Sequence, residues 1–437
     1  MAEALSGFPE WLPEQELFQR RLIELVRRQF ELHGFAPLQT RSIEIATDLL
    51  GEGGDTDKEI YGVQRLAADP SEGAAKMALH FDLTVPFARY VVENRAALTF
   101  PFRRYQIQQA WRGERPQLGR YREFIQADAD VIASGEMDVR FDREMVALLR
   151  STLDVLPIPK VKLLANNRKL LEGFYRGLGI EDIPGTLRIV DKIAKIGPQK
   201  VAELLVARGL TATQAEKCVA ITDIEIRSDA DAQRVLDLGA KHEMLDEGLR
   251  ELLFVLSASR DAARPDSIVG ALSIARGLDY YTGTVVEGVF EDHPKLSAVC
   301  SGGRYDNLAS GRTKEKLPGV GVSIGITRLM GYCAHLGLLK EERPRRTPAV
   351  VYVLVHGDAE REASEEVART LRKRGIPTLV SDSAAAYGKQ IRSANQLGVP
   401  YIWFPARGEG SAHEVKDLLA GDQGPADLAT WAPKPGV

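Results

Sequence analysis

The stretch FRRYQIQQAWRGERPQLGRYREFIQADADVIA, residues 102–133, has two β-patterned arms on either side of a turn-rich loop, GERPQLG. This order predicts a long β-hairpin. Along the second arm, a period of two puts Gln126, Asp128 and Asp130 on one face and small or apolar residues on the other. Such a polar row is costly to bury unless it faces water or a polar ligand. The arm is therefore either a half-exposed strand with a wet polar face or one wall of a binding site.

Basic side chains are dense in and beside this hairpin. They are Arg103, Arg104, Arg112, Arg115, Arg120 and Arg122. Guanidinium groups fork onto phosphate oxygens, whereas a carboxylate face suits a cationic group. The combination predicts a substrate that carries phosphates at one end and an amine at the other.

The segments before and after the hairpin indicate several domains, as the length of 437 residues also does. Residues 13–34 have apolar residues at helical spacing and end at Gly34, which predicts a helix. After about residue 155 the chain becomes helical and charged, and the strand-rich pattern resumes at SIVGALSIARGLDYY, residues 267–281. A helical block between two sheet-forming stretches is typical of an insertion into one domain.

The last part of the chain has a different pattern. The charged, proline-containing stretch KEERPRRTP, residues 340–348, is typical of a linker. Beyond it, strand-like and helical segments alternate, which predicts a small α/β domain around a parallel sheet.

Composition excludes several classes of protein. A net charge of −4 does not indicate a DNA-binding protein. Cys218, Cys300 and Cys333 are too few for a disulfide framework, and the seven histidines do not cluster at metal spacings. We interpret the cysteines as reduced core thiols and expect a cytoplasmic protein. No signal peptide and no membrane-spanning stretch is expected.

Several motifs together resemble a known family. The hairpin up to Phe124 resembles motif 2 of the class II aminoacyl-tRNA synthetases. ARGLDYYTGTVVE (275–287) and CSGGRYDNL (300–308) resemble the signature stretches of the histidyl-tRNA synthetase family, and GVGVSIGITRL (319–329) resembles motif 3. The likeness runs over essentially the whole chain. It implies an α+β catalytic core, with an antiparallel sheet and flanking helices, a helical insertion and a C-terminal α/β anticodon-binding domain.

The resemblance and the composition shifts together predict domain boundaries. The catalytic core is expected in two parts with a mostly helical insertion between them, followed by a linker and the anticodon-binding domain. The ranges are 1–155 and 265–338 for the core, 156–264 for the insertion, 339–348 for the linker and 349–437 for the last domain.

The activity implied by the resemblance is that of a histidine–tRNA ligase. Such an enzyme activates L-histidine with ATP to histidyl-adenylate and pyrophosphate, then transfers histidine to the 3′ end of its tRNA. Two alternatives remain open from the sequence: a catalytically silent histidine-binding paralogue like the regulatory subunit of ATP phosphoribosyltransferase, and a tRNA-sensing regulatory module. The first of these generally lacks the C-terminal domain.

The resemblance assigns four residues to ATP. Arg112 is expected to fork onto the α-phosphate, Glu114 to meet the adenine end and Arg120 to reach the γ-phosphate. Arg328 matches the motif 3 arginine that packs on the adenine and the γ-phosphate.

Further residues are assigned to histidine. Asp82, Thr84 and Gln126 match groups that hold the α-amino group. Asp130 and Tyr281 match the pair that reads the imidazole nitrogens.

RGLDYY supplies two more residues that the resemblance implicates. Arg276 matches an arginine beside the α-phosphate and the histidine carboxylate, where it is expected to neutralise charge on the phosphorus during attack. Tyr280 is expected to line the histidine site. An arginine that merely pairs with Asp279 at a turn is the alternative reading of Arg276.

Cofactors and partners follow from the same resemblance. ATP is expected with Mg²⁺, whose protein ligands the sequence does not identify, and no permanently bound cofactor is expected. Histidine, ATP and histidine tRNA are the expected partners, and a homodimer is expected by analogy with the class II core.

Overall fold

The computed structural model describes residues 5–50, 58–67, 73, 75–261, 263–274, 281–307, 312–340, 344–408 and 410–434. The chain divides into two compact units. The first comprises Met1–Pro9 and Leu22–Tyr332, and the second comprises Glu10–Arg21 and Cys333–Val437. Each unit is described by itself below.

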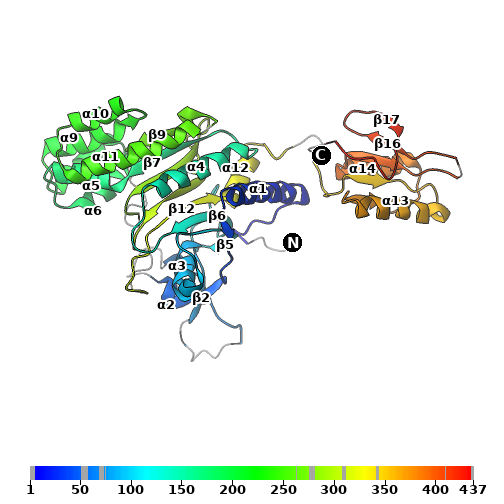
Figure 1. Cartoon of the computed structure of the whole chain (residues 1–437), viewed down its shortest axis with the longest axis horizontal. Coiled ribbons are helices and arrows are strands. Elements are labelled where there is room, and N and C mark those ends of the chain that lie inside the picture. The colour runs from blue at the N-terminus through cyan, green and yellow to red at the C-terminus, as the bar shows by residue number, and fades with distance from the viewer. Residues whose placement is uncertain are drawn as a thin grey trace. The chain divides into compact units, whose positions relative to one another are not determined.

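A large sheet forms the centre of the first unit (Figure 1). Among the described residues it has nine strands in the order β1-β5-β6-β12-β11-β10-β7-β9-β8. The strands are β1 (Ala36–Pro37), β5 (Phe102–Trp111), β6 (Glu123–Ile132), β12 (Gly319–Gly325), β11 (Cys300–Tyr305), β10 (Thr284–Phe290), β7 (Val161–Asn167), β9 (Ile268–Ala271) and β8 (Glu225–Ile226). All pairings from β5 to β7 are antiparallel, which confirms the expected antiparallel core.

The predicted hairpin is present as β5 and β6, with Arg104 opposite Asp130 and Gln106 opposite Asp128. The half-exposed reading of its second arm is wrong. Asp128 and Asp130 on one face are each only 3% exposed, and Ala127 and Ala129 on the opposite face are buried as well. Strand β6 lies inside the sheet, so β5 and β12 cover its two edges, and both of its faces are buried over residues 127–132 as well. Its polar face therefore has to find polar partners within the protein or in a ligand.

Helices pack beside this sheet in the first unit. They are α3 (Thr84–Asn94) and α4 (Arg140–Val155), together with the part of α1 (Pro13–Leu32) from Leu22 onward and the part of α12 (Ile326–His335) up to Tyr332. Helix α4 contacts β12 and buries Phe141, Met145, Leu148 and Leu149, a spacing that lines one helical face. Short elements precede α3: β2 (Ile43–Ile45), α2 (Ala46–Leu49), β3 (Gly62–Val63) and β4 (Met77–Leu79).

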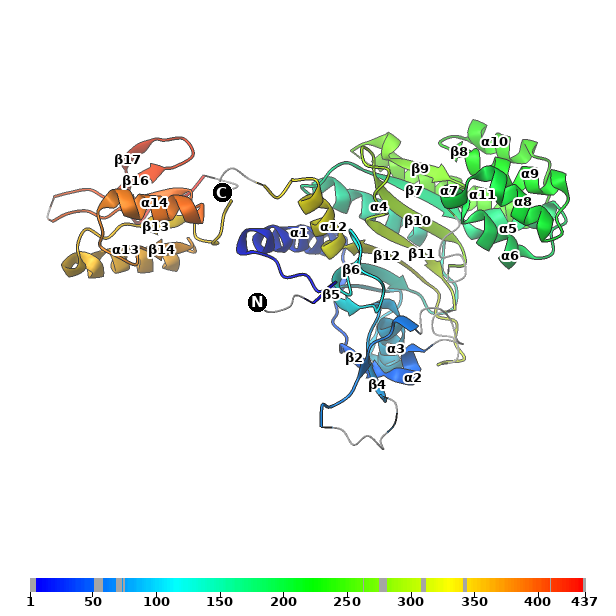
Figure 2. The same ribbon diagram turned by 180° about the vertical axis from the view of Figure 1, so that it is seen from behind.

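The helical block lies at the β7–β9 end of the large sheet, as Figures 1 and 2 both show. Its helices are α5 (Arg168–Gly177), α6 (Ile183–Val190), α7 (Ile193–Ile196), α8 (Pro198–Ala207), α9 (Ala212–Ala220), α10 (Asp229–Asp237) and α11 (Glu243–Leu256). Helices α5 and α11 cross at Gly173 and Gly248, where an added Cβ would overlap the backbone of the other helix. The range 156–264 is mostly helical, but it also contains β7 and β8 of the large sheet.

The second unit contains an α/β fold with its own sheet. Its elements are β13 (Val351–Val353), α13 (Arg361–Lys373), β14 (Thr378–Val380), α14 (Tyr387–Leu397), β15 (Tyr401–Phe404), β16 (Glu414–Asp417) and β17 (Gln423–Pro425). Strand β13 pairs in parallel with β14 and β15, as predicted, but β16 and β17 add an antiparallel hairpin. The sheet is therefore mixed. None of the helices in the described part of the chain has the length and apolar character that crossing a membrane requires.

Candidate active site

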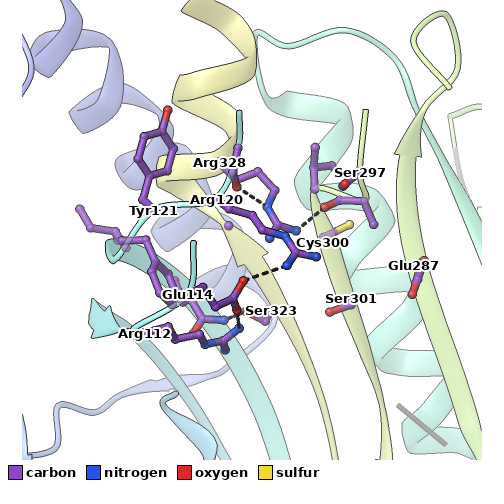
Figure 3. Close-up of a pocket in the computed structure, with 17 residues that line it drawn as sticks. Arg112, Glu114, Arg120, Tyr121, Glu287, Ser297, Cys300, Ser301, Ser323 and Arg328 are labelled. Atoms are coloured by element: carbon purple, nitrogen blue, oxygen red, sulfur yellow. Dashed lines mark hydrogen bonds and ion pairs between the residues drawn. The ribbon is translucent and has the colours of Figure 1, made fainter. Parts of the chain in front are cut away.

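A cavity in the first unit opens between the hairpin loop, the ends of β6, β11 and β12, and α12 (Figure 3). Its lining includes the four residues predicted for ATP: Arg112, Glu114, Arg120 and Arg328. They come from sequence positions more than 200 residues apart, yet Figure 3 shows the four side chains clustered on one side of the cavity. The structure thus brings this predicted set together. We call this cavity the arginine pocket.

Hydrogen bonds fix the orientation of its guanidinium groups. Arg112 donates from Nε to the carbonyl oxygen of Phe81 at 2.9 Å, and Arg120 donates from Nη1 to Oε2 of Glu114 at 2.9 Å. Nη1 of Arg112 lies 3.9 Å from the other carboxylate oxygen of Glu114. Glu114 therefore lies between two cations and holds both in the cavity wall.

Arg328 is anchored by backbone carbonyl groups from two other segments. Nε donates to Gly119 at 2.8 Å and Nη1 to Ala298 at 2.7 Å. Gly119 has a φ of +73°, and a Cβ there would overlap the ring of Tyr332, so glycine permits this turn. Burial lowers the pKa of Arg328, and the charges of Arg120 and Arg112 lower it further. These cations repel one another, so a polyanion such as a triphosphate would relieve the repulsion.

A second, smaller cavity adjoins the first, and the two share Ser301 and Ser323 in their linings. Its wall contains Thr84, Asp128, Asp130, Tyr281, Ser301, Gly302, Tyr305, Gly321, Val322 and Ser323. We call it the carboxylate pocket. A Cβ at Gly321 would overlap Oδ1 of Asp130, and a Cβ at Gly302 would overlap the carbonyl oxygen of Gly321. Gly321 therefore makes room for the Asp130 side chain, whereas Gly302 permits the close approach of β11 to β12.

Asp130 is held by two neighbours in this pocket. The hydroxyl of Tyr305 donates to Oδ1 at 2.7 Å, and Nη2 of Arg104 forms an ion pair with Oδ2 at 2.8 Å. The Arg104 contact is close but too poorly aligned to be a hydrogen bond. Burial raises the pKa of Asp130, while Arg104 and Tyr305 act in the opposite direction.

The other residues predicted for histidine lie in different positions. Thr84 and Tyr281 line the carboxylate pocket, and burial raises the pKa of Tyr281. Gln126 lines the arginine pocket and donates to the hydroxyl of Ser323 at 2.9 Å. Asp82 lines neither of these two pockets; its Oδ1 accepts from the backbone N–H of Val85 in the first turn of α3. Burial raises the pKa of Asp82.

Two predicted residues, Arg276 and Tyr280, lie outside the described residues. The expected convergence of Arg112 and Arg276 on one phosphorus atom therefore stays a prediction.

Sequence reasoning assigned no individual contact to four side chains that form the two pockets or support them, although Arg104 belonged to the predicted phosphate-binding arginines and Asp128 to the predicted carboxylate face. They are Arg104, Asp128, Glu287 and Tyr305. For Arg104 the available signal was the hairpin register, which sets it opposite Asp130. For Asp128 it was the alternation that put its side chain between Gln126 and Asp130. Glu287 lies on β10 and Tyr305 on β11. These strands lie beside the pockets because of the order of strands in the sheet, which the local sequence does not indicate.

Comparison with known proteins gives the following likenesses. A family model described as histidyl-tRNA synthetase matches residues 7–329, and one described as an anticodon binding domain matches residues 349–405. The chain is 47% identical to a histidine–tRNA ligase of Micrococcus luteus, across 98% of this chain and 96% of that protein. It is 39% identical to one of Xanthomonas campestris, across 95% of this chain and 92% of that protein.

Solved structures give the same picture at the level of fold. The histidyl-tRNA synthetase of Nostoc superposes with a TM-score of 0.88 and 32% identity, covering 98% of each chain. A Bacillus halodurans protein, titled an ATP phosphoribosyltransferase regulatory subunit/histidyl-tRNA synthetase, has a TM-score of 0.72. It covers 90% of this chain and 96% of that one at 19% identity, which shows a common fold alone.

Proposed function

The chain belongs to the histidyl-tRNA synthetase family and is a histidine–tRNA ligase, and we propose that its two adjoining pockets hold the two reactants of amino-acid activation. ATP occupies the arginine pocket and histidine the carboxylate pocket. The relatives that span nearly the whole chain are ligases, which favours this function over a silent regulatory paralogue or a tRNA-sensing module.

One observation supports the proposal most directly: the two pockets have opposite charge and a common border. Arg112, Arg120 and Arg328 line the first, whereas Asp128 and Asp130 line the second. A triphosphate is matched by the guanidinium groups, and the ammonium and ring nitrogens of histidine are matched by the carboxylates. The histidine carboxylate would then lie at the border, next to the α-phosphate.

Individual ATP roles follow this arrangement. In the proposal, Arg112 contacts the α-phosphate with its terminal nitrogens, since its Nε is already bonded to Phe81. Arg120 reaches the γ-phosphate, and Arg328 packs on the adenine and γ-phosphate. Glu114, which orients two of these cations, meets the adenine end.

Histidine roles are proposed in the same way. Thr84 and Gln126 hold the α-amino group together with Asp82, while Asp130 and Tyr281 lie at the imidazole end. Arg276 is proposed to stabilise charge at the reacting phosphorus, with Tyr280 beside the histidine.

The chemistry then needs no nucleophilic side chain. An oxygen of the histidine carboxylate attacks the α-phosphorus while the bond from that phosphorus to the pyrophosphate oxygen breaks. Guanidinium groups fixed before the reaction stabilise the charge that develops, and the pockets supply the orientation. The terminal ribose hydroxyl of the tRNA then attacks the activated carbonyl, and AMP leaves.

Magnesium is proposed to enter with ATP. No group of three or more His, Cys, Asp or Glu side chains suited to a metal occurs in the described residues, so a preformed protein site is not found there. Glu114 and Glu287 line the arginine pocket, which fits an ion that takes most of its ligands from phosphates and water. When bound, Mg²⁺ would screen phosphate charge.

The second unit is proposed to recognise the tRNA. Its residues 349–405 match the anticodon-binding model, and we keep 339–348 as the linker and 349–437 as the domain. The core is proposed as 1–155 and 265–338, with 156–264 as the insertion. A homodimer is proposed because the class II core pairs in related enzymes. A cytoplasmic location is proposed because the charging of tRNA serves translation.

Histidine-dependent ATP–pyrophosphate exchange tests the proposal. The protein should exchange label only when histidine is present, and it should charge purified histidine tRNA in preference to other tRNAs. Absence of exchange in a folded protein would contradict the assignment of the two pockets.

A further inference from the structure

Asp128 is a buried carboxylate to which the roles above assign no individual contact with histidine. It lies on β6 between Gln126 and Asp130, on the same face of the strand, and is 3% exposed. Its side chain lines the carboxylate pocket together with Thr84 and Tyr281. A buried charge in such a position normally has a dedicated partner.

Asp128 differs from Asp130 in its contacts. Both oxygens of Asp130 have a close neighbour, Tyr305 at Oδ1 and Arg104 at Oδ2. In contrast, Oδ1 of Asp128 is buried without any hydrogen-bond donor from the described part of the protein. The side chain of Ser323, opposite it on β12, is the hydrogen-bonding neighbour of Asp128 and also accepts from Gln126. Oδ2 of Asp130 also accepts no hydrogen bond from the described residues, but the guanidinium group of Arg104 lies 2.8 Å from it. Oδ1 of Asp128 is therefore a buried acceptor in this pocket that is available to a ligand.

The charges nearby also favour a ligand with a donor. Burial raises the pKa of Asp128 to about 7, and although Arg104 opposes this rise, Asp130 and Asp82 add to it. One buried guanidinium therefore serves several carboxylates, and its closest contact is with Asp130. A nitrogen-bound hydrogen from a ligand would satisfy Asp128 and relieve the repulsion.

We propose that Asp128 accepts a hydrogen bond from a ring nitrogen of the bound histidine and that it determines the choice of histidine over amino acids with similarly shaped rings. This inference rests on the proposed binding of histidine in the carboxylate pocket. Asp130, held by Arg104 and Tyr305, shapes the same end of the pocket. An apolar ring would leave the Asp128 oxygen without a partner, and such a loss is a strong source of discrimination.

The test compares histidine with 3-(2-thienyl)alanine, which has a five-membered aromatic ring without nitrogen but keeps the ammonium and carboxylate groups. For each protein, KM for histidine and for ATP and the inhibition constant of thienylalanine are measured by pyrophosphate exchange. In Asp128→Asn, KM for histidine should rise roughly tenfold, as expected when a charged acceptor is replaced by a neutral amide oxygen that forms a weaker hydrogen bond. The binding of thienylalanine should change little, so the preference for histidine should fall by a similar factor, and KM for ATP should stay within about twofold of wild type.

Asp142→Asn is the matched control. Asp142 is an equally buried carboxylate in the same unit, but it pairs with Arg304 and lines neither pocket. This variant should lose stability without changing the ratio between histidine and thienylalanine. If Asp128→Asn does not fold, Ser323→Ala keeps the carboxylate and removes its neighbouring hydroxyl, and a smaller fall in the same ratio is expected.

Two outcomes would overturn the inference. One is an unchanged ratio in folded Asp128→Asn. The other is equal weakening of histidine and thienylalanine, which would place Asp128 at the ammonium group or give it a purely structural role. Failure of the proposed function can be told apart from failure of this inference, because the wild-type protein would then lack histidine-dependent exchange altogether.

Discussion

Arg104 and Asp130 form an ion pair across β5 and β6, with Nη2 of the arginine 2.8 Å from Oδ2 of the aspartate. Arg104 is completely buried, and its guanidinium carbon lies 4.2 Å from the ring centroid of Phe87. The hairpin register sets the two residues directly opposite each other. Because Asp128 is the next acidic residue on the same face, Arg104 also offsets part of its charge, although its ion pair is with Asp130.

Replacing Arg104 with methionine should strongly destabilise the protein. The change leaves Asp130 buried without its counter-charge, and breaking a buried pair in this way costs about 3–5 kcal/mol. Urea unfolding measures the loss. Arg103→Met is the control, since Arg103 pairs with Glu144 in a partly exposed position and should cost about 1 kcal/mol or less. Equal losses in the two variants would contradict the role given to Arg104.

The fold was largely predictable from local patterns. Alternation with a period of two, interrupted by a turn-rich loop, predicted β5 and β6, and the alternating segments after residue 349 predicted the α/β part of the second unit. The hairpin β16–β17 was missed because its strands, EVKD and QGP, lack the apolar run by which the equally short β13, β14 and β15 were found. Burial of both faces of β6 was also missed, because a strand's neighbours in a sheet come from distant sequence.

The site was predictable only where a motif carried it. Arg112, Glu114, Arg120 and Arg328 were expected together and line one cavity. Arg104 and Tyr305, in contrast, contact Asp130 through strand register and sheet order, which periodicity within one segment does not contain. No pattern in the sequence distinguishes Asp130, which contacts Tyr305 and Arg104, from Asp128, whose Oδ1 accepts no hydrogen bond from the described residues.

Stability should depend on pH through Asp128. Its pKa is 3.8 in the reference state and about 7 in the folded protein, so the native state binds this proton more tightly than the unfolded state. The contribution of Asp128 to stability is therefore complete below pH 3.8 and is lost as pH rises toward 7, by at most about 1.4 kcal/mol per pH unit. Asp128→Asn removes this dependence.

Urea unfolding at pH 5 and pH 8 checks that expectation. Between these values wild type should lose more stability than Asp128→Asn, since all other titrating groups are common to the two proteins. If wild type and Asp128→Asn lose the same unfolding free energy between pH 5 and pH 8, the pKa of Asp128 in the folded protein lies in its ordinary range.

A methyl group at position 321 should close the carboxylate pocket. In Gly321→Ala the new Cβ would overlap Oδ1 of Asp130, and neither neighbour of that carboxylate leaves it room to move. KM for histidine should rise at least tenfold, with a loss of about 1–3 kcal/mol in unfolding free energy from overpacking. Gly388→Ala in α14 is the control; no atom would contact its Cβ, so this change should be neutral or stabilising by up to about 1 kcal/mol. A fully active Gly321→Ala protein would show that the pocket relaxes.

Arg112→Lys should separate the shape of the Arg112 cation from its charge. Arg112 uses Nε to bond the carbonyl oxygen of Phe81, which directs its remaining nitrogens into the arginine pocket. Lysine keeps the charge but cannot make both contacts, so kcat/KM for pyrophosphate exchange should fall about 100-fold or more, as expected when a preorganised donor at the reacting phosphorus is lost.

Arg122→Lys is the control in the same loop, because Arg122 bonds the carbonyl oxygens of Glu114 and Ser6 and does not line the pocket. Pyrophosphate exchange in Arg122→Lys should stay within about threefold of wild type, because Arg122 supports the loop and has no proposed contact with phosphate. If Arg112→Lys retains wild-type kcat/KM, charge alone suffices at this position and the proposed fork onto the α-phosphate is wrong.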